Sequence, residues 1–247
     1  MQKEIIPQCN ILGVRVAAIH MNTALNYINE NLSKFSGQYI CISNVHTTIM
    51  SYEDESYRNI QNKAVFALPD GKPLSVICRK RGYMEADRIT GPDLMREIFS
   101  CSKECGYTHY FYGSTTNTLR LLERELKGKY QLSIVGMYSP PFRKLTEDED
   151  RQVIEKINQV RADFIWVGLG APKQERWMYE HQGKVHGLMI GVGAGFDYFA
   201  GNIKRAPMWM QKCSLEWLYR LIQDPKRLFK RYLITNTKFL WLIARGK

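Results

Sequence analysis

The stretch from Asp163 to Arg205 constrains the fold of this chain more than any other. It contains two apolar runs, Phe164–Val167 and Leu188–Val192, and glycines follow each run. A short apolar run that ends in a tight glycine turn is typical of a buried strand in a parallel sheet. The stretch therefore predicts two neighbouring strands whose carboxyl ends lie at the edge where open α/β sheets bind ligands.

Glycine and polar residues follow both of these predicted strands closely. They are Gly168, Gly170, Gln174 and Glu175 after the first strand, and Gly193, Asp197 and Arg205 after the second. A glycine pair after a strand is, by itself, more often a plain turn than a ligand contact. Two polar groups at adjacent strand ends are harder to explain by packing, so we expect these residues to contact a substrate.

The rest of the chain alternates between strand and helix patterns. Predicted strands are Tyr39–Ser43, Ala64–Leu68, Tyr110–Tyr112 and Leu132–Val135, and predicted helices are Asn22–Leu32, Thr48–Asn62, Thr116–Lys127 and Glu147–Val160. An apolar run at Ile11–Ile19 precedes them and is interpreted as structural. Such alternation predicts a Rossmann-like, mostly parallel sheet flanked by helices, here over residues 1–202.

Three further predicted turns carry polar candidates. Asn44 and His46 follow the strand Tyr39–Ser43, and Asp70 follows the strand Ala64–Leu68. A lone histidine is more often a core or capping residue than a ligand, and an Asp-Gly pair is by default a turn. Because these residues lie directly after predicted buried strands, their positions favour a role in substrate binding or catalysis.

Two helix starts are also candidates for substrate binding. Thr90 and Gly91 read as an N-cap and a first helical turn that could face a ligand. Gly113 and Ser114 lie between a strand and a helix, where backbone N–H groups and the helix dipole could hold a diphosphate. The strand–Gly-Ser–helix motif is weak when taken alone.

Residues 203–247 differ in composition from the rest. They hold eleven Lys or Arg and two Asp or Glu residues, so their formal charge is 11 − 2 = +9, out of +11 for the whole chain. Arg220, Arg227, Lys230 and Arg231 recur at helical spacing among tryptophans and leucines. A basic amphipathic helical appendage of this kind suits an anionic membrane interface. A nucleic-acid-binding tail or a helical dimer interface are the alternatives.

The six cysteines are scattered and suggest neither a zinc site nor a disulfide framework. The sequence begins without a signal peptide, and no apolar run approaches the length of a membrane span. We therefore expect a cytoplasmic protein whose membrane contact is peripheral. No metal or other cofactor is predicted.

Several long motifs occur together in one order. They are LPDGKPL, RITGPDLM, YFYGSTTNTL, GLGAPKQERW, GVGAGFDYFAGNIKRAP and LEWLYRLIQDPKRLFKRY. The set resembles the signature of the WecG/TagA/CpsF glycosyltransferases, glycosyltransferase family 26, from about Tyr39 to Tyr232. The resemblance implies a fold of the GT-E type. It also implies transfer of a sugar from a nucleotide diphosphate donor to a polyprenyl-diphosphate-linked acceptor in surface polysaccharide assembly.

The resemblance also implies roles for particular residues. The aspartate of LPDG, Asp70 here, is the family's proposed general base, and Asn44 matches a substrate contact. The family has a threonine two residues before that asparagine, where this chain has Ile42. Ser43 or Thr47 could supply the missing hydroxyl, or the donor sugar could differ. The C-terminal appendage, with Arg220 and Arg227, is thought to close over the site at the membrane.

The leading hypothesis is an inverting, metal-independent glycosyltransferase. Its expected partners are a UDP-sugar, a lipid-linked saccharide and an anionic membrane surface on the cytoplasmic side. A homo-oligomer, in which a second copy of the chain is a partner, is kept as an alternative to the monomer. One rival is a nicotinamide-dependent oxidoreductase, but a G-x-G-x-x-G in a first βα unit is lacking. The other is a non-catalytic nucleic-acid-binding protein, for which no recognition module is found, so nucleic acid is not expected as a partner.

Overall fold

A computed structural model describes residues 6–213 and 215–246 and contains one eight-stranded sheet. The strands are β1 (Gln8–Ile11), β2 (Val14–Ala17), β3 (Tyr39–Ser43), β4 (Phe66–Pro69), β5 (Thr108–Gly113), β6 (Ser133–Tyr138), β7 (Phe164–Gly168) and β8 (Leu188–Gly191). Their order is β1-β2-β4-β3-β8-β7-β5-β6, and every pair except the β1–β2 hairpin is parallel. The predicted Rossmann-like, mostly parallel sheet is confirmed.

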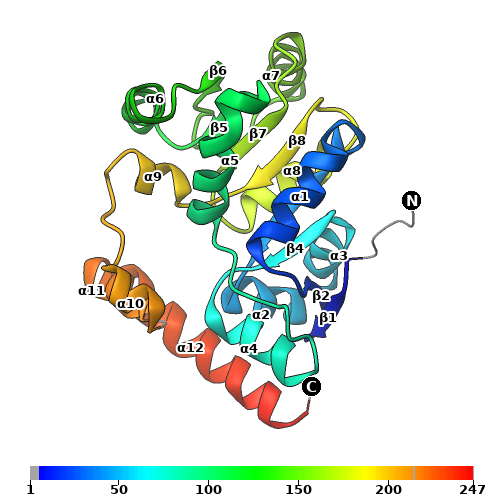
Figure 1. The fold of residues 1–247 in the computed structure, drawn as a ribbon, viewed down its shortest axis with the longest axis vertical. Helices are drawn as coiled ribbons and strands as arrows, with labels where there is room; N and C mark the ends of the chain where they lie inside the picture. The colour runs from blue at the N-terminus through cyan, green and yellow to red at the C-terminus, as the bar shows by residue number, and fades with distance from the viewer. Residues whose placement is uncertain (1–5, 214, 247) are drawn as a thin grey trace.

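Helices cover both faces of the sheet (Figure 1). They are α1 (Met21–Asn31), the 3₁₀-helix η1 (Leu32–Phe35), α2 (Val45–Glu53), α3 (Glu55–Lys63), α4 (Lys72–Lys80), α5 (Gly91–Cys105), α6 (Thr116–Tyr130), α7 (Glu147–Gln159), α8 (Lys173–Glu180), α9 (Gly195–Phe199), α10 (Met208–Lys212), α11 (Glu216–Gln223) and α12 (Pro225–Ala244).

Side chains alternate between two hydrophobic cores along the central strands. In β7, Phe164 and Trp166 join a cluster with α1, α5, α6 and α9, whereas Ile165 and Val167 join a second cluster with α3, α7 and α8. Strands that are buried on both faces need no polar side, which explains the continuous apolar runs of the sequence. The sheet is therefore a central layer between two helical layers.

The structure differs from the sequence-based prediction at the helix expected over Thr48–Asn62. Two helices, α2 and α3, replace it, and Asp54 lies between them. The Asp54 carboxylate accepts hydrogen bonds from the backbone N–H groups of Ser56 and Tyr57, at 2.8 and 3.2 Å. An aspartate N-cap of this kind starts a new helix and explains the break.

The parallel strands end side by side at one edge of the sheet. Ser43 at the end of β3 is in register with Pro69 of β4, and Gly113 at the end of β5 is in register with Gly168 of β7. Because β8 lies between β3 and β7, the turns that follow these five strands form one continuous edge. This edge carries most of the candidate site residues.

The C-terminal helices pack against the core on the side of α2 and α4. Figure 1 shows α12 running beneath α2 and α4. Phe239 and Leu242 of α12 are buried in a third hydrophobic cluster, together with residues of β1, β2, α2 and α4. The division of the chain at residue 202 into a core and a separable appendage stays a prediction.

Candidate active site

Asp70 and Asn44 lie next to each other at the ends of β4 and β3. Asn44 caps α2: its side-chain oxygen accepts from the Thr47 N–H at 3.1 Å, and the Thr47 hydroxyl accepts from the Asn44 N–H at 2.9 Å. This capping box fixes the Asn44 amide, whose NH₂ group is left to donate to the Asp70 carboxylate. The Asp70 N–H donates to the Ser43 carbonyl at 2.7 Å, which holds the two strand ends together.

The surroundings of Asp70 shift its titration toward neutral pH. Burial raises its pKa, Arg88 and Arg220 lower it through their positive charges, and Glu216 raises it again; the result is about 6. A carboxylate with such a pKa is ionised near neutral pH yet basic enough to accept a proton. The site therefore holds a group suited to general-base catalysis.

Arg220 reaches this site from α11. Its guanidinium lies 5.6 Å from the ring centroid of Tyr198, at the end of α9, and its charge acts on both Tyr198 and Asp70. Arg88, in the loop before α5, pairs with Glu216 of α11 at 3.0 Å. Two guanidinium groups thus face the Asp70 side of the sheet edge, where they could stabilise negative charge.

Gln174 joins the glycine turns that follow β7 and β8. Its side-chain oxygen accepts from the N–H groups of Gly170 and Gly193, at 3.1 and 3.0 Å. Both glycines have positive φ angles, of 76° and 53°, which side-chain-bearing residues rarely adopt. The two predicted turns are therefore brought together as one structural unit, as expected from the sequence.

Glu175 lies behind these turns and is completely buried. Its carboxyl group accepts a hydrogen bond from the Gln174 side chain at 2.8 Å and interacts with the Tyr57 hydroxyl, and burial raises its pKa. In this position the carboxyl group supports Gln174 from the protein side. The predicted substrate contact of Glu175 stays a prediction.

The turn between β5 and α6 lies near Asp197. Ser114 has a φ of 57° and donates its backbone N–H to the Gly168 carbonyl at 3.1 Å. Asn202 donates to both the Thr118 hydroxyl, at 3.0 Å, and the Asp197 carboxylate, at 3.1 Å. Asp197 is thereby tied to the first turn of α6, which follows the Gly113-Ser114 turn predicted to hold a diphosphate.

Comparison with known proteins assigns this arrangement to a family. The family model described as "Glycosyl transferase WecG/TagA/CpsF family" matches residues 9–247. The chain belongs to this family. The resemblance inferred from the sequence motifs is confirmed, and the chain is a glycosyltransferase.

Three curated relatives carry the name N-acetylglucosaminyldiphosphoundecaprenol N-acetyl-beta-D-mannosaminyltransferase. The relative from Bacillus subtilis (strain 168) is 28% identical over 221 residues, which cover 84% of each chain. The relative from Bacillus spizizenii is 27% identical, over 99% of this chain and 92% of its own length. The relative from Staphylococcus aureus (strain MW2) is 29% identical, over 92% and 89%.

Ile42 stands where the WecG/TagA/CpsF pattern has a threonine, so this position lacks a hydroxyl group and contributes to the hydrophobic core instead. Ile42 is buried in the core on one face of β3. The Ser43 hydroxyl donates to the Gln61 side chain at 2.5 Å, and the Thr47 hydroxyl belongs to the capping box with Asn44. Both candidate replacements for the missing threonine hydroxyl are therefore engaged within the protein.

Thr90, Gly91 and Arg205 meet at the start of α5. Thr90 caps the helix by accepting from the Asp93 N–H at 3.2 Å, and a Cβ on Gly91 would lie 3.2 Å from the Val192 carbonyl oxygen. Arg205 makes a bidentate ion pair with Asp93, at 2.6 and 2.7 Å. In this state the Arg205 guanidinium is held by carboxylates of the protein, and its contact with a substrate stays a prediction.

The structure describes only some of the predicted site residues on α12. Burial lowers the pKa of His46, and the nearby positive charge of Arg231 lowers it further. His46 Nδ1 and Arg231 Nε are buried and lack a hydrogen-bond partner among the described residues. Lys230 is exposed, and the Arg227 side chain lies outside the part of the chain that the structure describes.

Sequence reasoning missed two residues near Asp70, namely Arg88 and Tyr198. Both stand inside quoted motifs, RITGPDLM and GVGAGFDYFAGNIKRAP, so the motifs themselves were the signal. Their role depends on Glu216 and Arg220 of α11, which the fold brings to them from far along the chain. Residue spacing could not reveal this contact.

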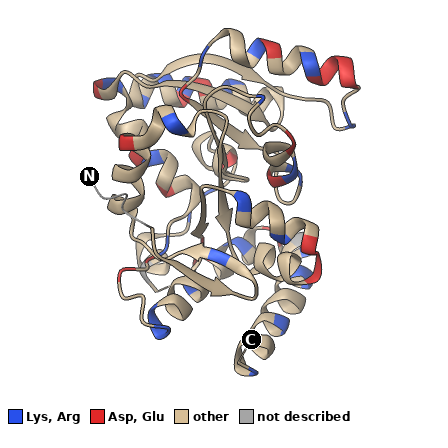
Figure 2. Cartoon of the chain, turned by 90° about the vertical axis from the view of Figure 1, so that its right-hand side faces the viewer, with Lys and Arg blue, Asp and Glu red and all other residues tan. Residues whose placement is uncertain are grey.

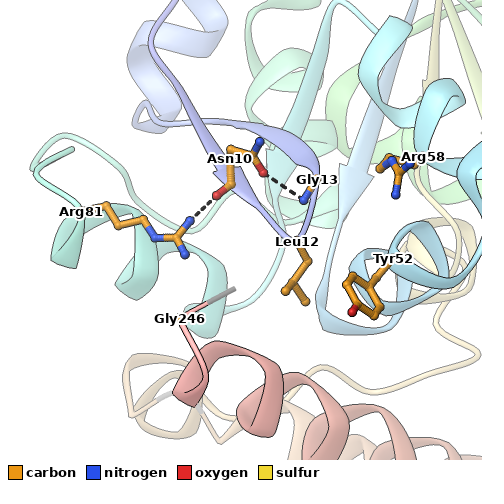
Figure 3. Close-up of a pocket in the computed structure, with 7 residues that line it drawn as sticks. All are labelled: Asn10, Leu12, Gly13, Tyr52, Arg58, Arg81 and Gly246. Carbon is orange, nitrogen blue, oxygen red and sulfur yellow. Dashed lines mark hydrogen bonds between the residues drawn. The ribbon is translucent and has the colours of Figure 1, made fainter.

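A separate cavity of about 470 Å³ lies at the β1–β2 hairpin (Figure 3). Its lining residues are Asn10, Leu12, Gly13, Tyr52, Arg58, Arg81 and Gly246. The Arg81 guanidinium donates to the Asn10 carbonyl, and the Gly13 N–H donates to the Asn10 side chain at 2.9 Å. None of the predicted site residues lines this cavity.

No group of three or more His, Cys, Asp or Glu side chains among residues 6–213 and 215–246 is arranged to hold a metal ion. In the same part of the chain, no helix has the length and apolar character that crossing a membrane requires.

Proposed function

We propose that this glycosyltransferase transfers a sugar, with inversion, from a UDP-sugar to a polyprenyl-diphosphate-linked saccharide in surface polysaccharide synthesis. The named activity of the three relatives supports a lipid-linked N-acetylglucosamine as acceptor and N-acetylmannosamine as the first sugar to test. Ile42 is the reason to test other sugars as well. The family match decides against the oxidoreductase and nucleic-acid-binding alternatives.

The observation that carries the proposal is the placement of Asp70 at the carboxyl edge of the sheet, held to the end of β3 and close to Arg88 and Arg220; its pKa of about 6 agrees with this role. In the proposed reaction, the Asp70 carboxylate accepts the proton of the acceptor hydroxyl as the hydroxyl oxygen attacks the anomeric carbon. The bond from that carbon to the diphosphate breaks, and UDP leaves with the bonding electrons. A positioned general base contributes about 10²–10⁴ to such a rate.

The departing diphosphate needs positive charge. Arg220 and Arg88 lie on the Asp70 side of the sheet edge, and the Gly170 and Gly193 turns lie further along it. Guanidinium groups match phosphate oxygens in geometry and stay ionised at every physiological pH. We assign Arg220 to the leaving group, with Arg227 in the same role from the start of α12.

The nucleoside is proposed to lie toward α6. Asp197 is half-buried and near the β5–α6 turn, where Gly113 and Ser114 offer backbone groups next to a helix N-terminus. A carboxylate in this position can accept hydrogen bonds from a ribose or from the uracil N–H. These contacts would hold the donor while its diphosphate faces the arginines.

Membrane attachment is proposed for α10–α12. Large apolar side chains are exposed along these helices, including Met208, Trp209, Trp217, Phe229, Leu233, Leu240 and Trp241. Figure 2 shows basic positions along the helix that ends at the C-terminus. Exposed aromatic and aliphatic groups beside Lys and Arg favour an anionic lipid surface. The enzyme would then meet its lipid-linked acceptor on the cytoplasmic face of the membrane.

The test is a transfer assay with purified protein, a synthetic polyprenyl-diphosphate N-acetylglucosamine acceptor and a panel of UDP-sugars. We expect product from UDP-N-acetylmannosamine or a related UDP-hexosamine, with unchanged rates after EDTA treatment. Product from none of the UDP-sugars would reject the proposed donor class. A rate that EDTA removes and magnesium restores would overturn the metal-independent mechanism.

A further inference from the structure

Four charged side chains close a ring between the core and α11. Arg205 joins Asp93, at 2.6 and 2.7 Å, to Glu216, at 3.2 Å. Arg88 joins the same two carboxylates, at 3.0 Å to Glu216 and 3.8 Å to Asp93. The side chains are between 14% and 20% exposed, so water screens this ring much less than a surface ion pair.

Two members of the ring, Asp93 and Arg205, have strongly shifted pKa values. Burial alone would raise the pKa of Asp93, but hydrogen bonds from Arg205 and Thr90 outweigh it and lower the pKa to about 2. The pKa of Arg205 is raised, because its bonds and charge interactions with Asp93 and Glu216 outweigh burial. Asp93 and Arg205 therefore stay ionised over the physiological pH range, and the four side chains together form a clasp between the core and α11.

Arg220 depends on this clasp through the geometry of α11. Glu216 is the first residue of α11, and Arg220 follows it by one helical turn, on the same face. Fixing Glu216 against Arg88 and Arg205 therefore fixes the direction in which Arg220 points. Arg220 is found beside the Tyr198 ring with its charge acting on Asp70.

We propose that Asp93 and Glu216 are positioning residues, which hold α11 against the core so that Arg220 stays beside Asp70. The proposal rests on the function given above, because Arg220 is assigned there to the leaving diphosphate. Neither carboxylate is assigned a contact with a substrate. Loosening the clasp should lower turnover more than donor affinity.

The first measurement uses trypsin on the full-length protein and needs no activity. Asp93→Asn and Glu216→Gln should each speed cleavage between α9 and α11 by about tenfold, since each removes charge-assisted hydrogen bonds from the clasp. Because Arg205 and Arg88 bridge the two carboxylates, the double variant should be cleaved more slowly than independent effects would give. Strictly multiplicative effects, or unchanged cleavage in both single variants, would overturn the proposal.

The second measurement is the pH dependence of transfer. Asp93→Asn removes a negative charge, so a direct effect on Asp70 would lower the pKa of Asp70, whereas displacement of Arg220 and Arg88 would raise it. We expect kcat to fall about tenfold, with a smaller change in the KM for donor, and the acid limb to move to higher pH. A purely structural Asp93 would leave the limb in place, and that result would also reject the proposal.

The matched control is Glu149→Gln. Glu149 makes an equally short bidentate pair with Arg143, at 2.6 and 2.7 Å, at the start of α7. This variant should leave cleavage near α11, kcat and the acid limb unchanged. If no variant and no wild-type protein transfers sugar, the proposed function fails, and the cleavage data alone decide whether the clasp holds α11.

Discussion

Asp70 and Asp93 carry the same carboxyl group, yet their surroundings move the two pKa values in opposite directions. Asp93 accepts hydrogen bonds from Arg205 and Thr90, which outweigh burial and lower its pKa to about 2. Asp70 is half-buried with Glu216 as a neighbouring negative charge; desolvation raises its pKa, Arg88 and Arg220 offset this only in part, and the result is about 6. At neutral pH, Asp93 can only pair with cations, whereas Asp70 can accept a proton.

Asp70 should therefore destabilise the fold at neutral pH. Its folded pKa of about 6 exceeds the unfolded value of 3.8, so the folded state loses stability as the pH rises from 3.8 through 6. Asp70→Asn has no such loss, and we expect it to melt at a higher temperature than wild type at pH 8. Calorimetry should show this difference shrinking toward pH 4. A lower melting temperature at pH 8 would mean that the carboxylate is stabilised by its neighbours.

Asp197 tests the nucleotide side of the site. Asp197→Ala should weaken UDP binding by roughly 1.5–3 kcal/mol if the carboxylate accepts hydrogen bonds from the nucleoside. Isothermal calorimetry measures this, with the exposed Asp148→Ala as control. Unchanged affinity in a folded Asp197→Ala protein would limit this carboxylate to its hydrogen bond with Asn202.

Among the elements, α11 has the clearest single role, because it carries Arg220 to the sheet edge. Arg220→Ala should lower turnover by about 10²-fold or more, as loss of a charge-stabilising donor does in other active sites. Liposome sedimentation should hardly change, since one charge is lost from a segment of +9, that is 11 − 2. The opposite pattern, full turnover with weaker liposome binding, would assign Arg220 to the membrane surface.

The central strands were predictable because each is an apolar run that ends in a turn residue, and β3 was predicted at its observed bounds. The break at Asp54 was missed because a charged residue in a polar segment also fits an exposed helix face. In the structure, the Asp54 carboxylate accepts hydrogen bonds from the N–H groups of Ser56 and Tyr57 and starts a new helix. Capping chemistry in the sequence could have located this boundary.

The whole molecule could be predicted only in outline. Alternating patterns gave a parallel sheet and placed Asn44, Asp70 and Gln174 at strand ends. The strand order was not readable, because β8 pairs with β3 across most of the chain length. The clasp of Arg88, Asp93, Arg205 and Glu216 was missed for the same reason.

The helix α12 has two sides with different expected roles. Phe239 is buried against the core, whereas Phe229 is 59% exposed. Phe239→Ala should destabilise the protein by about 3–5 kcal/mol in urea unfolding and leave liposome binding of the folded protein intact. Phe229→Ala should leave the free energy of unfolding nearly unchanged and weaken liposome binding. Equal destabilisation by both variants would contradict a lipid-facing side of α12.

A chain cut after Asn202 also loses the buried Phe239 side chain. It should therefore be destabilised, as Phe239→Ala is.

The most direct test of the central claim is Asp70→Asn, assayed for both sugar transfer and UDP binding. The amide has nearly the shape of the carboxylate but cannot accept the proton, so transfer should fall by about 10²-fold or more. UDP affinity should stay within error of wild type, and the exposed Asp87→Asn should retain both properties. Transfer by Asp70→Asn at the wild-type rate would contradict the assignment of Asp70 as the general base.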